Sequence, residues 1–476
     1  MIPRRADVWI AAGSALAARL GIVAWGCRLF PPVEDGHYYD VLARRLASGH
    51  GYTWLWPDGA VTYAGHYPVG YPALLAAAYV LFGASTAAAM TLNAVVGAAA
   101  ACGGYVLVDE PGVSRWRPLG AALVIALHPA LVPYTAAVMT EGVTASLLVV
   151  AGALAARARA ATHPARARLA AGVALALATL LRPQSLLVAP VFGFFGAAPA
   201  ASLSRRLARA AMTTAIVLVC ICPWTMRNCV RMHRCALVSV NGGWNLLIGT
   251  TTTTGGWAPV SVPRPCATVW DEAMKDVCFG DWARREIARA PAAWLARAPE
   301  KIAMTFDYFG AAPWYLHSSN PEAFGARAQW ALGAVETLAS RVCLLGALVA
   351  CGRSGGRFPT ARKLLALTGS FAALTLHAWL GYAAFAVCAM TRGWRSVVRG
   401  PTVFVYTAGV IVVTALVHAV FFGAGRYGLI VVPFLAAAAF GDSPRSAAPS
   451  RAAAPSRGKE SLSPEVGSGE RVDVAL

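Results

Sequence analysis

Charged residues are scarce in this chain of 476 residues, and acidic ones are the scarcer kind. Only 13% of the residues are charged and 57% are hydrophobic, whereas about a quarter of an average soluble domain is charged. Apolar segments of about 20 residues, long enough to cross a bilayer, recur from end to end. This excludes a soluble protein. Because a spanning helix satisfies its own backbone hydrogen bonds, we expect an all-α polytopic membrane protein.

The few charges are mainly basic, with a net charge of +19. In a soluble protein such a surplus would suggest nucleic-acid binding, but here the basic residues lie in short loops between apolar segments, as the positive-inside rule describes. We therefore expect no nucleic-acid partner. Arg4 and Arg5 place the N-terminus in the cytoplasm, and the apolar stretch 8–30 is long enough to remain as a first spanning helix.

The order of apolar and polar segments predicts a protein of the inner (plasma) membrane with both termini in the cytoplasm. We expect a bundle of about 11–13 transmembrane helices, with helices in the external loops and a small external domain. The predicted parts are a transmembrane module at 1–227 with a long first external loop at 31–72, an external (periplasmic) domain at 228–329, further transmembrane helices at 330–441, and a disordered cytoplasmic tail at 442–476.

One segment does not fit a simple alternation of sides. Residues 364–390 are apolar but lie between two basic loops, and two cytoplasmic loops cannot flank a single crossing. Either the segment is a tight hairpin or re-entrant pair, or one of the basic loops is external.

Cysteine is also informative, because four of the 11 cysteines fall in the expected external domain. An even set in an oxidising compartment permits two disulfides, with three possible pairings. The four residues are Cys229, Cys235, Cys266 and Cys278.

Two adjacent carboxylates, Glu34 and Asp35, follow the first span. Tyr38, Leu42 and Leu46 fit one face of a short amphipathic helix on the membrane surface. The carboxylates could cap that helix, since acidic residues belong at helix N-termini, or they could act on a substrate. Spacing alone favours the cap.

Further polar residues gather at the expected outer face. Glu141 opens one span, while Arg182, Arg227 and Arg426 lie at the ends of others. Each arginine could simply extend its side chain to the interface. Together they indicate a positive region at the depth of a lipid-linked phosphate, beside a carboxylate that could deprotonate an acceptor hydroxyl.

The ordered motifs give a family resemblance. The chain resembles the GT-C superfamily of polyprenyl-phosphate-sugar glycosyltransferases, in the family 39-like branch that includes protein O-mannosyltransferases and the aminoarabinose transferases of lipid A. The motifs that carry it are Asp35 with Tyr38 and the stretch Leu42 to Tyr52, HYPVGYP at 66–72, Thr140–Glu141, Arg182–Pro183, PWTMRN at 223–228, SVNGG at 239–243, and HAVFFGAGRYGLIVVPFL at 418–435.

The resemblance implies a GT-C type bundle and sugar transfer with inversion. It assigns the catalytic base to Asp35, with Glu34 as the second candidate. Donor phosphate would be bound by Arg182, Arg227, Arg426 and Tyr427, and substrate by Tyr38, His66, Tyr67, Glu141 and Asn241. The expected partners are a polyprenyl-phosphate sugar, an acceptor that is a protein, lipid or glycan, and membrane lipid. No compact metal-ligand set is seen, so we expect no metal and no cofactor.

Two other functions stay open on sequence grounds. A transporter or flippase of a lipid-linked glycan would use the same arginines for binding, but it predicts internal repeats and charges near the bilayer midplane. A ligase or polymerase of surface polysaccharide would use a diphosphate-linked oligosaccharide. The charges cluster at the outer boundary, which favours an interfacial enzyme.

Overall fold

The computed structural model describes residues 5–307, 310–354 and 359–442, and helices make up nearly all of their regular secondary structure. Seven of the described helices are long and apolar enough to cross a membrane, and four shorter apolar helices accompany them. The prediction of an all-α, multi-pass membrane protein is confirmed. The predicted tail at 442–476 lies outside the described residues except for Asp442, and the predicted domain boundaries stay predictions.

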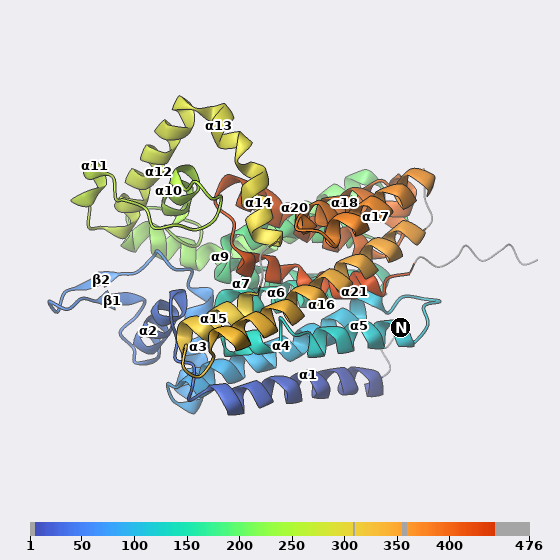
Figure 1. Cartoon of the computed structure of the whole chain (residues 1–476), viewed down its shortest axis with the longest axis horizontal. Helices are drawn as coiled ribbons and strands as arrows, with labels where there is room; N and C mark the ends of the chain where they lie inside the picture. Colours follow the sequence, from blue (N-terminus) through green and yellow to red (C-terminus); the bar gives the residue numbers. More distant parts are fainter. Residues whose placement is uncertain (1–4, 308–309, 355–358, 443–476) are drawn as a thin grey trace, which may run out of the picture. The chain divides into compact units, whose positions relative to one another are not determined.

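The first half of the chain alternates long helices with the elements of the first loop (Figure 1). Its elements are α1 (Arg5–Gly26), α2 (Asp35–Ala47), β1 (Thr53–Leu55), β2 (Val61–Tyr63), α3 (Gly70–Phe82), α4 (Thr86–Val108), α5 (Trp116–Leu127), η1 (Pro133–Ala136), α6 (Thr140–Ala160), α7 (Pro164–Leu181), η2 (Pro183–Val188), α8 (Ala189–Phe195) and α9 (Leu203–Arg231). The two strands form an antiparallel hairpin in which Trp54 pairs with Thr62.

The second half begins with short helices and then returns to long ones. Its elements are α10 (Gly242–Thr251), α11 (Arg264–Ala267), α12 (Glu272–Arg289), α13 (Pro291–Ala296), α14 (Ala298–Phe306), α15 (Ala311–Ser319), α16 (Ala326–Arg353), α17 (Pro359–Ala373), α18 (Ala378–Met390), α19 (Trp394–Arg399), α20 (Thr402–Val420), η3 (Gly425–Ile430) and α21 (Val432–Ala439).

Small residues let the central helices approach closely. A side chain at Gly103 of α4 would meet Val149 of α6 at 3.0 Å, and one at Gly104 would meet Ile125 of α5 at 2.2 Å. Lipid tails are as apolar as leucine, so van der Waals contact rather than hydrophobic burial drives such packing. The α4–α6–α7 core therefore forms a rigid support for the segments at its ends.

Helix α5 is short for a membrane crossing. Helix α5 ends at Leu127, because His128 precedes a proline and adopts an extended backbone. The last carbonyl oxygens of α5 have no partner within the helix and accept hydrogen bonds from buried Arg19 of α1. Arg19 donates to Ala126 O at 2.8 Å and to Ile125 O at 3.4 Å. An arginine inside a span thus caps a neighbouring helix.

The face of the first-loop helix is also rotated from its predicted position. Leu42 is buried as expected, but Tyr38 is 45% exposed, and Tyr39 and Ala43 are the residues that pack inward. The reason is that successive residues turn by about 100° around a helix, so a stripe of alanines and tyrosines fits two neighbouring faces about equally well.

Residues 364–390 form a hairpin, which answers the question that the two basic loops raised. Helices α17 and α18 pack against each other and are joined by a short turn. Arg341 of α16 donates to the carbonyls of Ala373 and Thr375, and Asp307 accepts from Trp379 N at 2.7 Å. Side chains of neighbouring elements therefore satisfy the backbone groups at the turn.

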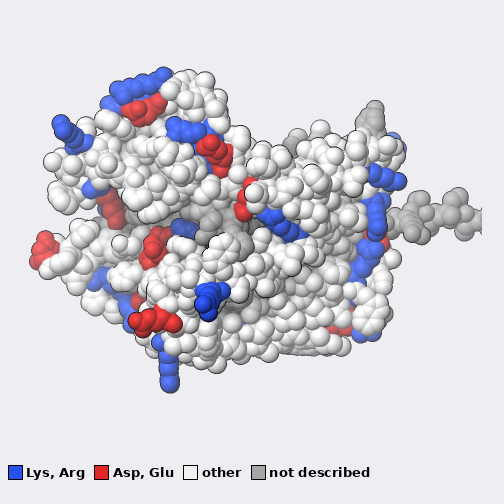
Figure 2. Space-filling model, in the orientation of Figure 1, with Lys and Arg blue, Asp and Glu red and all other residues white. Residues whose placement is uncertain are grey.

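Charge is distributed unevenly along the helix bundle. On the face in Figure 2, Lys and Arg gather at the right-hand end. Acidic and basic side chains mix at the left, where α2, the β1–β2 hairpin and α10–α12 lie.

Helix α9 is 29 residues long and runs past the boundary expected at 227. At about 1.5 Å per residue it measures about 43 Å, more than a bilayer core, so it joins the bundle to the segment beyond Asn228.

The cysteines predict a measurable outcome. The structure has the bridges Cys229–Cys235 and Cys266–Cys278, one of the three possible pairings. Peptide mapping after alkylation without reduction should recover these two links and leave the other cysteines labelled under denaturing conditions. A peptide linking Cys229 to Cys266 or Cys278 would contradict this pairing.

Candidate active site

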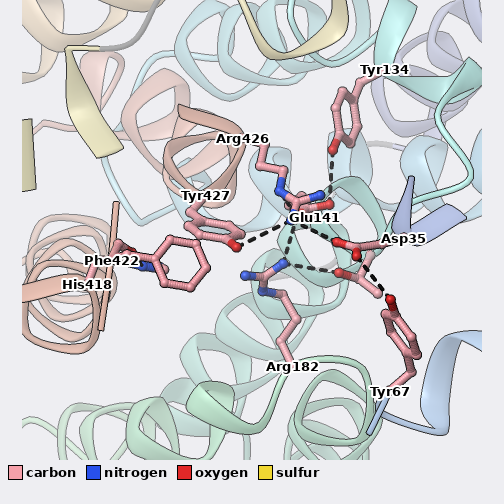
Figure 3. Close-up of polar contacts among 10 residues, drawn as sticks. Asp35, Tyr67, Tyr134, Glu141, Arg182, His418, Phe422, Arg426 and Tyr427 are labelled. Carbon is pink, nitrogen blue, oxygen red and sulfur yellow. Dashed lines mark hydrogen bonds and ion pairs between the residues drawn. The ribbon is translucent and has the colours of Figure 1, made fainter. Parts of the chain in front are cut away.

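Four segments that are distant in the sequence meet at one point (Figure 3). The first turns of α2 and α6 contribute Asp35 and Glu141, the end of α7 contributes Arg182, and η3 contributes Arg426. Each carboxylate lies at a helix N-terminus, where the helix dipole favours negative charge. The fold therefore brings together four of the residues that the sequence singled out.

Asp35 is paired but reachable. Its Oδ2 accepts from Arg426 Nη2 at 2.7 Å, its Oδ1 accepts from the Tyr67 hydroxyl at 3.4 Å, and its side chain is 33% exposed. Burial acts to raise the pKa of Asp35, but the charge and hydrogen bond of Arg426, with His66 and Arg182, hold it below its usual value. The carboxylate is ionised at neutral pH and can accept a proton.

Glu141 is the buried centre of the cluster. Its carboxylate accepts from Arg182 at 2.8 Å and from the Tyr134 hydroxyl at 2.9 Å, and Arg426 Nε lies 3.5 Å away. The side chain is 2% exposed. One negative charge thus holds two guanidinium groups that would otherwise repel each other. A direct contact between Glu141 and substrate stays a prediction.

Tyr427 fixes the position of Arg182 from one side. The Arg182 guanidinium lies 4.5 Å from the centre of the Tyr427 ring, and the His418 ring is stacked at 4.4 Å. His418 Nδ1 is 2.7 Å from Phe422 O. This stack joins α20, η3 and the end of α7, so the arginine is held before any ligand arrives.

Arg227 does not join this cluster. It donates to Ala64 O at 2.8 Å and Tyr52 O at 2.9 Å, and the Trp224 ring lies 4.8 Å from its guanidinium carbon. It therefore fastens the base of the first-loop hairpin to α9. Sequence position alone could not separate this arginine from Arg182 or Arg426. Its predicted phosphate contact stays a prediction.

Two other candidate residues lie apart from the cluster contacts. Glu34 is exposed, has a φ of 53°, and makes no side-chain capping bond to α2. The cap that spacing favoured is therefore not formed by Glu34, which leaves Asp35 as the placed carboxylate. Asn241 precedes α10 and accepts from the Ser239 hydroxyl at 3.0 Å.

Aromatic rings form a wall next to Asp35. Tyr38 is stacked on Tyr67 at 5.2 Å, and Trp54 and His66 meet the Tyr67 ring edge-on.

Burial raises the pKa of Tyr67, so its hydroxyl stays protonated and donates to Asp35. Burial lowers the pKa of His66, although Glu272 and Asp35 act in the opposite direction. The His66 ring is therefore mainly neutral near pH 7. Tyr38 is exposed, and its contact with substrate stays a prediction.

Glu272, the first residue of α12, was missed by sequence reasoning. Its carboxylate accepts from Trp54 Nε1 at 2.6 Å, from Gly65 N at 2.7 Å and from His66 N at 2.9 Å. It ties the segment that carries Tyr67 to the helices after α9. Nothing local in the sequence indicates this role, because the partners lie about two hundred residues away.

Tyr315 of α15 was also missed, and it links the two carboxylate-bearing turns. Its hydroxyl accepts from Val33 N at 3.4 Å and Val138 N at 3.2 Å. The turns touch directly, since a side chain at Gly36 would lie 2.7 Å from Val138 O. Only a glycine allows α2 to begin this close to the start of α6.

The cluster lies in a chain with no matching family model and no matching curated protein. Solved structures do match. One is the archaeal oligosaccharyltransferase AglB from Archaeoglobus fulgidus in complex with an inhibitory peptide and a dolichol-phosphate, with a TM-score of 0.45 and 14% identity over 91% of this chain and 49% of that one. Another is ArnT from Cupriavidus metallidurans bound to undecaprenyl phosphate, with a TM-score of 0.38 and 16% identity over 90% of this chain and 77% of that one.

Both are GT-C superfamily glycosyltransferases. This chain spans about half the length of the oligosaccharyltransferase. Because both TM-scores are below 0.5, the function is inferred below from the residues of the site. Among the described residues, no group of three or more His, Cys, Asp or Glu side chains could hold a metal. Metal independence stays a prediction.

Replacing Glu141→Gln should destabilise the protein in detergent. The change leaves Arg182 and Arg426 without their shared negative partner, and breaking a buried ion pair costs about 3–5 kcal/mol. Thermal unfolding should show a lower melting temperature. Glu34→Gln is the matched control, because the same change at an exposed carboxylate should leave the melting temperature unchanged. Equal melting of the two variants would contradict the central role of Glu141.

Proposed function

We propose that the protein is an inverting glycosyltransferase that moves a sugar from a polyprenyl-phosphate donor to an acceptor hydroxyl. The observation that carries the proposal is the ionised, partly exposed Asp35 beside two fixed arginines, Arg182 and Arg426, at the ends of membrane helices. A base next to paired cations suits a reaction in which a hydroxyl loses a proton and a phosphate leaves.

In the proposed step, Asp35 takes the proton of the acceptor hydroxyl. The acceptor oxygen forms a bond to the anomeric carbon as the bond between that carbon and the phosphate oxygen breaks. The electron pair of the broken bond leaves with the polyprenyl phosphate. Because attack and departure occur on opposite faces of the sugar in a single displacement, the anomeric configuration inverts. The aromatic wall of Tyr38 and Tyr67 would hold the sugar beside the carboxylate.

The arginines would stabilise the leaving group. The donor is a phosphodiester with one negative charge, and the departing monophosphate gains a second. Arg182 and Arg426 are already oriented by Glu141 and Tyr427, and preoriented donors need little rearrangement as charge develops. This is the interaction that would be stronger in the transition state than in the ground state.

Arg426 would also couple donor binding to base strength. In the free protein its Nη2 lies 2.7 Å from Asp35, and this pairing weakens the carboxylate as a base. A donor phosphate that draws Arg426 away would make Asp35 more basic just when the acceptor is due to react. The carboxylate would therefore accept the acceptor's proton most readily with the donor in place.

We further propose that the reaction occurs at the outer face of the plasma membrane, with both termini in the cytoplasm. Lys and Arg gather at the end of the bundle away from α2, which carries Asp35 (Figures 1 and 2), as the positive-inside rule expects of the cytoplasmic side. A transporter is less well supported. Arg19, a buried charge within the α1 span, is engaged by helix carbonyls rather than aimed at a ligand.

Asp35→Asn should lower the transfer rate by about 10²-fold or more, since an amide cannot act as the base. The assay would use purified protein in liposomes with polyprenyl-monophosphate sugars and, in parallel, diphosphate-linked oligosaccharides. Glu34→Gln should keep nearly full activity. Full activity of the Asp35→Asn protein would refute the assignment, and turnover of diphosphate-linked donors alone would favour a ligase or polymerase.

Arg426→Gln should move the acid limb of the pH profile of kcat/KM to higher pH. Activity requires the deprotonated carboxylate, and Arg426 favours that form by holding the pKa of Asp35 low. Without the guanidinium the proton binds more tightly, so activity is lost at a higher pH as the solution is acidified. In the Arg227→Gln variant the acid limb should stay in place, because the guanidinium of Arg227 contacts the first-loop backbone and not Asp35.

A further inference from the structure

A second pair of arginines lines a hollow far from Asp35. Arg168 of α7 and Arg209 of α9 line a small hollow among α6, α7, α8 and α9 that is partly open to solvent. We call this hollow the basic pocket. None of the described residues that line it is acidic.

The basic pocket lies at the opposite end of α7 from Arg182 and toward the opposite end of α9 from Arg227, which contacts the first loop. Thirteen residues separate Arg168 from Leu181, the last residue of α7, which is about 20 Å along the axis. Arg209 lies 18 residues before Arg227 on α9, which is about 27 Å. These distances approach the thickness of a bilayer core. We therefore place the pocket at the membrane surface opposite the candidate active site.

The two arginines lack the partners that neighbouring arginines have. Within the described part of the chain, the Arg168 side chain makes no hydrogen bond or ion pair, and its Nε is buried without a partner. The Arg209 side chain makes one hydrogen bond within the same part of the chain, from Nη1 to Met212 Sδ at 3.5 Å. The two guanidinium groups are also close enough to repel each other electrostatically.

Other arginines at this end are satisfied by the protein itself. Arg206 is buried and donates to Ala198 O at 3.0 Å and Pro199 O at 2.9 Å. Arg159 donates to Val398 O at 2.7 Å and Gly400 O at 3.0 Å. The fold thus supplies carbonyl acceptors where it needs them, and it leaves Arg168 and Arg209 without any.

We propose that the basic pocket binds the phosphate of an anionic phospholipid from the adjacent leaflet. The planar guanidinium fork matches phosphate oxygens, and basic pockets between membrane helices are suited to anionic headgroups. Leu169 and Leu207, next to the pocket in sequence, are 56% and 55% exposed, so an apolar surface is available for the acyl chains. That surface favours a lipid over free phosphate.

The bound lipid would bridge α7 and α9. These helices already touch, since a side chain at Gly172 would lie 2.5 Å from Ile216. A phosphate between Arg168 and Arg209 would replace repulsion with attraction across the same contact. This inference does not depend on sugar transfer, because it concerns residues remote from Asp35.

Native mass spectrometry of the purified full-length protein would test the proposal. Phosphatidylglycerol should bind more strongly than phosphatidylcholine, and the Arg168→Gln/Arg209→Gln double variant should lose about tenfold or more in phosphatidylglycerol binding. The matched control is Arg166→Gln/Arg205→Gln, which removes the same charge from exposed positions at the same end. That control should retain binding.

Thermal unfolding supplies a second measurement that does not depend on activity. In phosphatidylcholine the pocket variant should melt no lower than the native protein, because two unpaired like charges have been removed. Phosphatidylglycerol should raise the melting temperature of the native protein and the control but not of the pocket variant.

Three results would overturn the proposal. One is equal loss of phosphatidylglycerol in both double variants, and another is equal binding of phosphatidylcholine and phosphatidylglycerol. The third is stabilisation by inorganic phosphate that matches the lipid effect and disappears in the pocket variant, which would identify a soluble anion as the ligand.

Discussion

The candidate active site depends on a balance of charge between two carboxylates and two guanidinium groups. Removing ions from water is costly unless opposite charges meet in good geometry, and here Asp35 and Glu141 face Arg182 and Arg426 with a net charge of zero. No two of the four come from the same element. The ends of α2, α6, α7 and η3 must therefore converge, and the small-residue packing of α4 with its neighbours provides the rigid frame for it.

The same balance explains why the four charges are not equivalent. Glu141 is covered, accepts hydrogen bonds from Tyr134 and Arg182 and forms an ion pair with Arg426, so it orients its neighbours. Asp35 has one strong partner and one weak one and is a third exposed. A reactant can therefore reach Asp35 but not Glu141. The difference follows from position, since Glu141 opens a helix inside the bundle and Asp35 opens one in the first loop.

Much of this could be predicted from the sequence, because hydropathy and motif order are local signals. They gave the helical membrane class and singled out Asp35, Glu141, Arg182 and Arg426, together with Arg227, which contacts the first-loop backbone instead. They could not give Glu272, Tyr134 or Tyr315, whose hydrogen bonds arise only when distant segments meet. The α17–α18 hairpin stayed ambiguous because two short apolar helices have the composition of one long span. The buried face of α2 was missed because two neighbouring faces of this helix carry similar alanine and tyrosine residues.

Helix α7 shows how the same side chain takes different roles at its two ends. Arg182 at one end meets Glu141 and the Tyr427 ring and is fixed in place. Arg168 near the other end meets no acid and no carbonyl in the described chain. An arginine that the protein satisfies can be preoriented for catalysis, whereas one that it leaves unsatisfied is stabilised by an anion from outside. Because one rigid helix carries both, a phosphate held near Arg168 would also steady the end that carries Arg182.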